Sequence, residues 1–138
     1  MGKILGIDFG DTRIGLAMSS ADERFVLPYQ TVKNDGSEEC IKTIQEIYQK
    51  EQVALIIVGL PLDQHGEMGG KAKAVREWGD RLTRRSGIRI EYEDERYTTV
   101  FANKTKKQAG WSVKETRQTI DQTAASMILQ TYVDKRHG

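Results

Sequence analysis

The run VALIIV at residues 53–58 most constrains the fold, because it is apolar at every position and rich in β-branched side chains. A strand with one solvated face alternates apolar and polar residues, whereas this run contains no polar residue. It therefore predicts a parallel strand inside a sheet that is covered on both faces. Helical stripes of apolar residues at 41–48 and at 72–82 flank the run and favour an α/β architecture.

The first two predicted strands form an antiparallel hairpin, because a short turn with a glycine entry separates them at residues 10–12. Pro28 interrupts the next segment, so the third strand is predicted to be an edge strand. The whole chain thus predicts a central mixed five-stranded sheet flanked by helices. The expected strands are 3–9, 13–19, 29–32, 53–58 and 88–92, and the expected helices are 37–52 with Ser37 as N-cap, 72–82, 98–109 and 120–133.

A chain of 138 residues without a break in composition predicts a single domain over residues 1–138. Its one cysteine, Cys40, cannot form an internal disulfide, and a lone thiol is typical of a reducing compartment. No stretch reaches the length of a membrane-spanning helix, and no apolar signal region precedes the first strand. We therefore expect a cytoplasmic protein that does not contact a membrane.

Charge is distributed unevenly along the chain, although the formal net charge is only +1. Residues 1–70 carry 6 Lys/Arg against 11 Asp/Glu, residues 71–117 carry 13 against 7, and the remaining residues carry 2 against 2. Binding to a phosphate backbone depends on such local clusters rather than on the total charge. The middle region is therefore a candidate nucleic-acid surface, although a solvated helical face would give the same composition.

Asp8 is a candidate metal ligand, because it lies in phase with Ile4 and Gly6 on an otherwise apolar strand. A carboxylate persists at such a position when it is paired, hydrogen-bonded or bound to a hard cation such as Mg²⁺. The glycines Gly6, Gly10 and Gly15 remove side chains around it and would leave room for a ligand to approach the backbone. The alternative is an aspartate that caps its own hairpin turn.

Two further acidic positions lie at the ends of predicted elements. Glu95, in EYEDERYTT, directly follows a predicted strand and precedes a helix, and Asp94 competes with it for the same role. Asp121 heads an apolar helical stripe that includes Ala125. Both positions would also suit an ordinary acidic residue at a helix start. Together with Asp8, they could bind the Mg²⁺ or Mn²⁺ ions that support hydrolysis of a phosphodiester.

Four segments of the chain form a recognisable series: ILGIDFGDTRIGLAMS, IIVGLPLDQHGE, EDERYTT and IDQTAASMILQTY. In this order they resemble the characteristic segments of the YqgF family, and the resemblance covers nearly the whole chain. It implies a ribonuclease H-like fold and a nuclease, acting either on Holliday junctions or on the precursor of the small-subunit ribosomal RNA. The acidic positions of the family fall on Asp8, Glu95 and Asp121.

The resemblance favours 5′-end processing of pre-16S rRNA in ribosome biogenesis, with Holliday junction resolution in DNA recombination and repair as the alternative. The expected partners are structured RNA or branched DNA, including a ribosome precursor, and the protein would act as a monomer or a homodimer. Contacts to phosphates are expected from the following side chains: Arg13, Lys71, Arg96, Thr98, Thr99, Lys104 and Lys107.

Two other classes of function fit part of the sequence. DFGDTRIG resembles the phosphate-binding hairpin of the sugar kinase and actin superfamily, which would imply an ATP-binding protein. Such kinases enclose their nucleotide between two domains, and this chain has residues for one. The other class is a nucleic-acid or ribosome-assembly binding module that keeps the fold without cleavage, against which the three acids argue.

Overall fold

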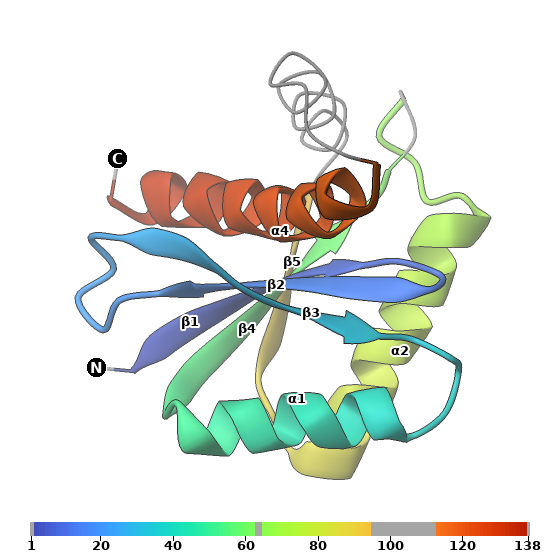
Figure 1. Ribbon diagram of the computed structural model, residues 1–138, viewed down its shortest axis with the longest axis horizontal. Helices are drawn as coiled ribbons and strands as arrows, with labels where there is room; N and C mark the ends of the chain where they lie inside the picture. The colour runs from blue at the N-terminus through green and yellow to red at the C-terminus, as the bar shows by residue number, and fades with distance from the viewer. Residues whose placement is uncertain (1, 63–64, 95–112, 138) are drawn as a thin grey trace.

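The computed structural model describes residues 2–62, 65–94 and 113–137, and its centre is a five-stranded sheet with helices on both faces (Figure 1). The strand order is β3-β2-β1-β4-β5, in which β1 is antiparallel to β2 and parallel to β4. β2 and β3 are antiparallel, and β4 and β5 are parallel, so the predicted mixed α/β sheet is confirmed. The elements are β1 Lys3–Phe9, β2 Arg13–Ser19, β3 Val26–Lys33, α1 Glu39–Lys50, β4 Val53–Leu60, α2 Gly70–Ser86, β5 Ile90–Asp94 and α4 Val113–His137.

Strand β4 is buried on both faces, as its unbroken apolar run predicts. Leu55 and Ile57 pack against α4, whereas Ile56 and Val58 belong to the larger core beneath α1 and α2. Figure 1 shows the same division, with α4 on one face of the sheet and α1 and α2 on the other. Each of these side chains is at most 5% exposed. Burying a side chain of this size stabilises the fold by about 1.5–3 kcal/mol relative to leaving it in water.

Helix α4 approaches the β1–β2 hairpin closely, because glycines of the hairpin face it. A Cβ added at Gly6 would lie 2.8 Å from the Cβ of Leu129 and 3.0 Å from the backbone oxygen of Ala125. A Cβ added at Gly15 would lie 2.1 Å from the backbone oxygen of Asp121. The helix backbone therefore rests on the sheet at two points where any larger residue would push it away.

Ion pairs hold the C-terminal end of α4. Glu23 is 8% exposed between β2 and β3, and its carboxylate lies 3.4 Å from Nε of Arg136 and 3.2 Å from Nε2 of His137. Lys135 pairs with Glu93 of β5, which is 7% exposed. Because carboxylates buried to this extent need a partner, both pairs disfavour movement of the helix away from the sheet.

Helix α2 is fixed to β5 by a contact between Tyr92 and Gly79. A Cβ added at Gly79 would lie 2.2 Å from the Tyr92 hydroxyl, so only glycine allows this approach. The hydroxyl donates a hydrogen bond to the backbone oxygen of Arg76 at 3.3 Å. Burial raises the pKa of the Tyr92 hydroxyl above its ordinary value.

Three strands differ in extent from the sequence prediction, and one of them is β4, which runs to Leu60, two residues beyond its predicted end. β3 begins at Val26 rather than at residue 29, because it is an edge strand in which Pro28 can lie opposite Ala17. An edge strand leaves one side of its ladder unpaired, so the missing N–H of proline is tolerated there. β5 runs over Ile90–Asp94, two residues later than the predicted range, and Ile88 is buried just before it.

The predicted N-cap of the first helix was wrong. α1 begins at Glu39 with Glu38 as its N-cap, and no side chain makes a capping bond there. The hydroxyl of Ser37 accepts a hydrogen bond from the N–H of Glu39 at 3.3 Å, but Ser37 lies one residue before the N-cap position. The predicted helix at 98–109 lies outside the described residues. Among the helices that are described, none is both long enough and apolar enough to cross a membrane.

Replacing Gly6 with alanine should lower the free energy of unfolding by about 1–3 kcal/mol, because the added methyl group overpacks the contact with α4. Gly70→Ala is the matched control, since a Cβ added at Gly70 meets nothing within 4 Å and alanine favours the helix that begins there. Urea unfolding of both variants measures the difference. Equal stabilities would contradict the close approach of α4.

Candidate active site

Asp8 lies near the carboxyl end of β1, on the face of the sheet that α4 covers. Its Cα is opposite that of Gly15 on β2, and alternate residues of a strand share a face. Ile4, which is in phase with Asp8, packs against α4 in the smaller core. The strand therefore directs the half-buried Asp8 carboxylate toward the N-terminal half of α4.

Asp121 reaches the same place from α4. The backbone oxygen of Asp121 is the atom that a Cβ at Gly15 would strike, and Gly15 is the cross-strand neighbour of Asp8. Asp8 and Asp121 are 113 positions apart in the sequence, yet both lie beside this one glycine. The close packing of α4 is thus what brings two of the three predicted acids together.

Arg13 forms an ion pair with Asp121, with 2.7 Å between its Nε and Oδ2 of the carboxylate. The Arg13 side chain is 37% exposed and that of Asp121 is 18% exposed, so the pair is partly shielded from water. Arg13 was predicted as a phosphate contact, and the structure joins it directly to a predicted metal ligand. The ion pair fixes one oxygen of the carboxylate and links β2 to α4.

The three glycines that were predicted to leave room for a ligand also allow other parts of the chain to come close. Gly6 and Gly15 face α4, and a Cβ added at Gly10 would lie 2.5 Å from the backbone oxygen of Arg13. The space beside each of them is therefore filled by protein backbone or by α4 side chains. Their part in the site is to allow the helix and the hairpin turn to come close.

Glu95, the third predicted acid, lies outside the described residues, and β5 ends one residue before it at Asp94. Asp94 is in register with Leu60, whose side chain packs into the core beneath α1 and α2. Register therefore places Asp94 on the face of the sheet opposite to that of Asp8. Among the residues that the structure describes, no group of three His, Cys, Asp or Glu side chains could hold a metal ion.

Glu93 is a buried acid that sequence reasoning missed. It is in register with Gly59 of β4 and faces α4, where Lys135 neutralises it. The alternation of β5 could have indicated this position, because Glu91 and Glu93 share one face of the strand. Its pairing with Lys135 gives it a structural role, because it links β5 to the C-terminal end of α4.

The predicted phosphate contacts are only partly described. Lys71 is exposed in the first turn of α2, at the same end of the sheet as the end of β4. The remaining predicted contacts lie outside the described residues: Arg96, Thr98, Thr99, Lys104 and Lys107. The described part of the basic region is concentrated on α2, whose exposed cationic side chains are those of Lys71, Lys73, Arg76, Arg84 and Arg85.

Comparison with solved structures shows that the chain has a ribonuclease H-like fold. RuvC of Thermus thermophilus superposes with a TM-score of 0.55 at 14% identity, covering 99% of this chain and 96% of RuvC. The fowlpox virus Holliday junction resolvase superposes with a TM-score of 0.54 at 11% identity, covering 96% of this chain and 99% of the resolvase. At these identities the likeness concerns the fold alone.

The sequence itself defines the family more narrowly. The chain belongs to the RuvX family, described as Holliday junction resolvase, whose model matches residues 2–135. A "Putative pre-16S rRNA nuclease" of Nitrosospira multiformis is 36% identical over 99% of this chain and 91% of the relative. A relative of the same name from Chloroflexus aurantiacus is 38% identical over 98% of this chain and 88% of its own length. The RuvX family is the one predicted from the sequence under the name YqgF, so the predicted family is confirmed. The predicted class of enzyme, a nuclease that hydrolyses phosphodiester bonds, is confirmed as well.

A double-mutant cycle with Arg13→Gln and Asp121→Asn should give a coupling energy of about 1 kcal/mol or more, because the pair is partly buried. The exposed pair of Arg89, which directly precedes β5, and Glu91 of β5 is the control, with side chains 76% and 39% exposed. Its coupling should stay below about 0.5 kcal/mol. Urea unfolding of each set measures both values, and equal couplings would rule out a special link between β2 and α4.

Proposed function

We propose that the protein is a metal-dependent nuclease that processes the 5′ end of pre-16S rRNA, with Asp8, Glu95 and Asp121 as its catalytic residues. The observation that carries the site is the convergence of Asp8 and Asp121 beside Gly15. The RNA substrate is supported by the names of relatives that match this chain over nearly all of its length. The protein would work in the cytoplasm as one domain spanning residues 1–138.

The chemistry of the donors fits a hard divalent cation, because Mg²⁺ and Mn²⁺ prefer carboxylate oxygens. Asp8, Asp121 and Glu95 would hold the ion. Arg13 engages Oδ2 of Asp121, so Oδ1 is the oxygen of this carboxylate that would bind. A bound ion lowers the pKa of water and neutralises charge on the reacting phosphate.

The protein groups around the acids would position the substrate. Arg13 is a positioning residue, because its bond to Asp121 limits rotation of that carboxylate in the way that outer-shell partners orient metal ligands. Lys71 and the basic side chains beyond Glu95, including Arg96, would bind phosphates on either side of the scissile bond. Such contacts hold a strand in place without reading its sequence.

Holliday junction resolution is the second candidate, favoured by the description of the family model and by the resolvases that share the fold. A symmetric junction requires two coordinated cuts, so this activity would require a homodimer. Trimming of an RNA end requires only one site. The nucleotide-binding and non-catalytic alternatives have weaker support, because the family match is to nucleases over residues 2–135.

Asp8→Asn and Asp121→Asn should each lower cleavage more than about 100-fold, since loss of an outer-shell partner of a metal ligand alone lowers activity 10–100-fold. The purified protein would be incubated with pre-16S rRNA, a four-way DNA junction and single-stranded RNA, in Mg²⁺, Mn²⁺ or EDTA. Asp134→Asn is the matched control, because Asp134 is exposed on the same helix and bonds only to Gln130 in the described contacts. Cleavage that survives EDTA, or equal loss in the control, would contradict the proposal.

The choice between Asp94 and Glu95 has its own test. Asp94 belongs by register to the face opposite Asp8, so Asp94→Asn should retain cleavage within about threefold, which corresponds to less than 1 kcal/mol of barrier. Glu95→Gln should lower the rate as strongly as Asp8→Asn does. The two variants differ by one position and remove one charge each, so single-turnover rates compare them directly. The reverse result would assign the third ligand to Asp94.

A further inference from the structure

A second feature lies at the same end of the sheet on its opposite face. A cavity of about 520 Å³ opens between α2, the β1–β2 turn and the connection from β3 to α1. Phe9 lines it, and Phe9 follows Asp8 directly, so the pleat of β1 directs the two side chains to opposite faces. The cavity and the candidate active site are thus separated by the thickness of the strand.

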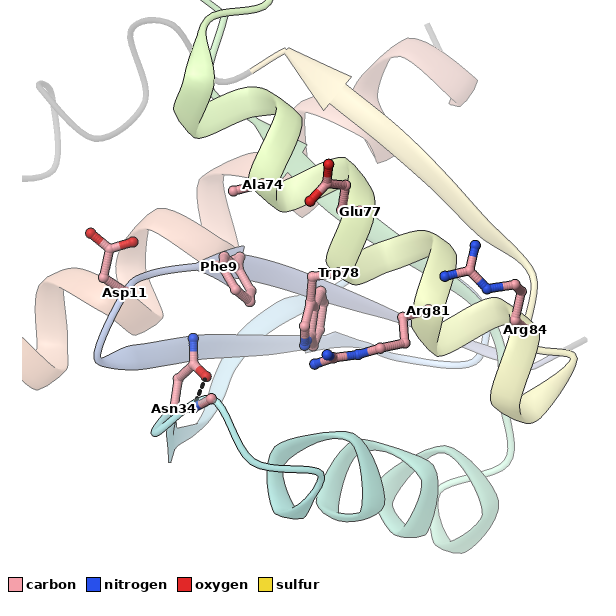
Figure 2. A pocket seen from close by; sticks show the side chains of 9 residues that line it. Phe9, Asp11, Asn34, Ala74, Glu77, Trp78, Arg81 and Arg84 are labelled. Carbon is pink, nitrogen blue, oxygen red and sulfur yellow. Dashed lines mark hydrogen bonds between the residues drawn. The ribbon is translucent and has the colours of Figure 1, made fainter.

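The wall formed by α2 presents two buried donors without acceptors. Nε1 of Trp78 and Nε of Arg81 are both buried, and neither has a hydrogen-bond partner within the described part of the chain. Trp78 is 5% exposed, and its ring packs on Phe9 with 4.8 Å between centroids. Figure 2 shows the Trp78 ring and the Arg81 side chain reaching from α2 over the sheet. A buried N–H without an acceptor is unfavourable, so this pair indicates a place for a ligand that accepts hydrogen bonds.

The charges around the cavity differ between its interior and its rim. Arg81 is half-buried, and Arg84, one turn further along α2, adds a second guanidinium to the lining. Asp11 and Glu77 also line the cavity, but both are exposed at its rim (Figure 2). Water and salt screen the exposed carboxylates more than they screen the buried donors. The interior therefore favours an anion, and the rim opposes it weakly.

We propose that this cavity binds a phosphate group through the Trp78 indole N–H and the guanidinium groups of Arg81 and Arg84. This part of the proposal rests on the proposed nuclease function: the phosphate belongs to the substrate strand and lies a short distance from the bond that is cleaved. A phosphate offers several acceptor oxygens and a negative charge. The oxygens match the unpartnered N–H groups of Trp78 and Arg81, and the charge matches the guanidinium groups of Arg81 and Arg84. A nucleobase would instead use the rim carboxylates as acceptors for its amino groups.

The binding test measures the fluorescence of Trp78, whose indole lies in the proposed site. The chain has two tryptophans, so Trp111→Phe leaves Trp78 as the only one. The measurement is made in an Asp8→Asn background with EDTA and at constant ionic strength, so neither cleavage nor metal binding contributes. The probes are inorganic phosphate, a nucleoside monophosphate, the uncharged nucleoside, and one RNA oligonucleotide with either a 5′-phosphate or a 5′-hydroxyl.

Titration with the oligonucleotide should change Trp78 fluorescence, and Arg81→Gln should weaken this binding about tenfold, as loss of a charged hydrogen bond does. Arg81→Lys, which keeps the charge but not the Nε–H geometry, should restore only part of the affinity. Glu77→Gln should tighten binding, because it removes a negative charge from the rim. Arg85→Gln is the matched control: Arg85 pairs with Glu38 and does not line this cavity. It should leave the affinity within about twofold, the effect of a surface ion pair.

The probes also separate the possible sources of the phosphate. Binding of both oligonucleotides identifies an internal phosphodiester of the strand, and binding of the 5′-phosphorylated form alone identifies a strand end. Binding of the mononucleotide but of neither oligonucleotide keeps the phosphate site and removes its link to the nuclease substrate. Thermal melting of each variant confirms that it is folded.

The proposal is overturned if no phosphate probe changes Trp78 fluorescence in the folded protein, or if Arg85→Gln weakens binding as much as Arg81→Gln. Tight binding of the uncharged nucleoside, or weaker binding in Glu77→Gln, would assign the cavity to a base instead. Failure of the nuclease proposal is separate, because it appears as unimpaired cleavage by Asp8→Asn and leaves these binding results unchanged.

Discussion

The contact between α4 and the two glycines of the β1–β2 hairpin is the constraint on which the site depends. The helix backbone touches the sheet at Gly15 through Asp121, and Gly6 receives Leu129 and Ala125. Because these contacts leave no free space, α4 cannot slide gradually along the sheet. The next equivalent position is a full turn away, about 5.4 Å, and would move Asp121 away from Asp8. The position of a predicted catalytic residue is therefore set by core packing.

Ion pairs stabilise the position of α4 on the sheet, both near Asp121 and at the C-terminal end of the helix. Arg13 pairs with Asp121 near the hairpin turn, and Glu23 and Glu93 pair with the last basic residues of α4. All three carboxylates are largely shielded from water and would be unfavourable without a partner. These pairs thus stabilise the docking of α4 near both of its ends, and the Arg13–Asp121 pair is the one that lies beside Asp8.

Sequence reasoning succeeded where a local pattern determines the structure. The apolar run of β4 and the alternation in β1 predicted the sheet, and the extents of β1 and β2 match the prediction residue for residue. It failed where the outcome depends on partners distant in the sequence. The Arg13–Asp121 pair joins residues 108 positions apart, and Gly6 and Gly15 contact residues of α4 that lie more than 100 positions later in the sequence. Burial of Glu93 depends in the same way on Lys135.

The pleat of β1 has a consequence for the form of the substrate. Asp8 and Phe9 are neighbours in the chain but open onto different sides of the sheet, one toward α4 and the other toward the cavity beneath α2. A nucleic acid that engages both sides has to bend around the end of the strand within a few nucleotides. Double-stranded DNA resists such curvature, because its persistence length is about 150 base pairs. A flexible, unpaired segment would follow that path without strain, so a strand bound as proposed at both places would have single-stranded character near the cleaved bond.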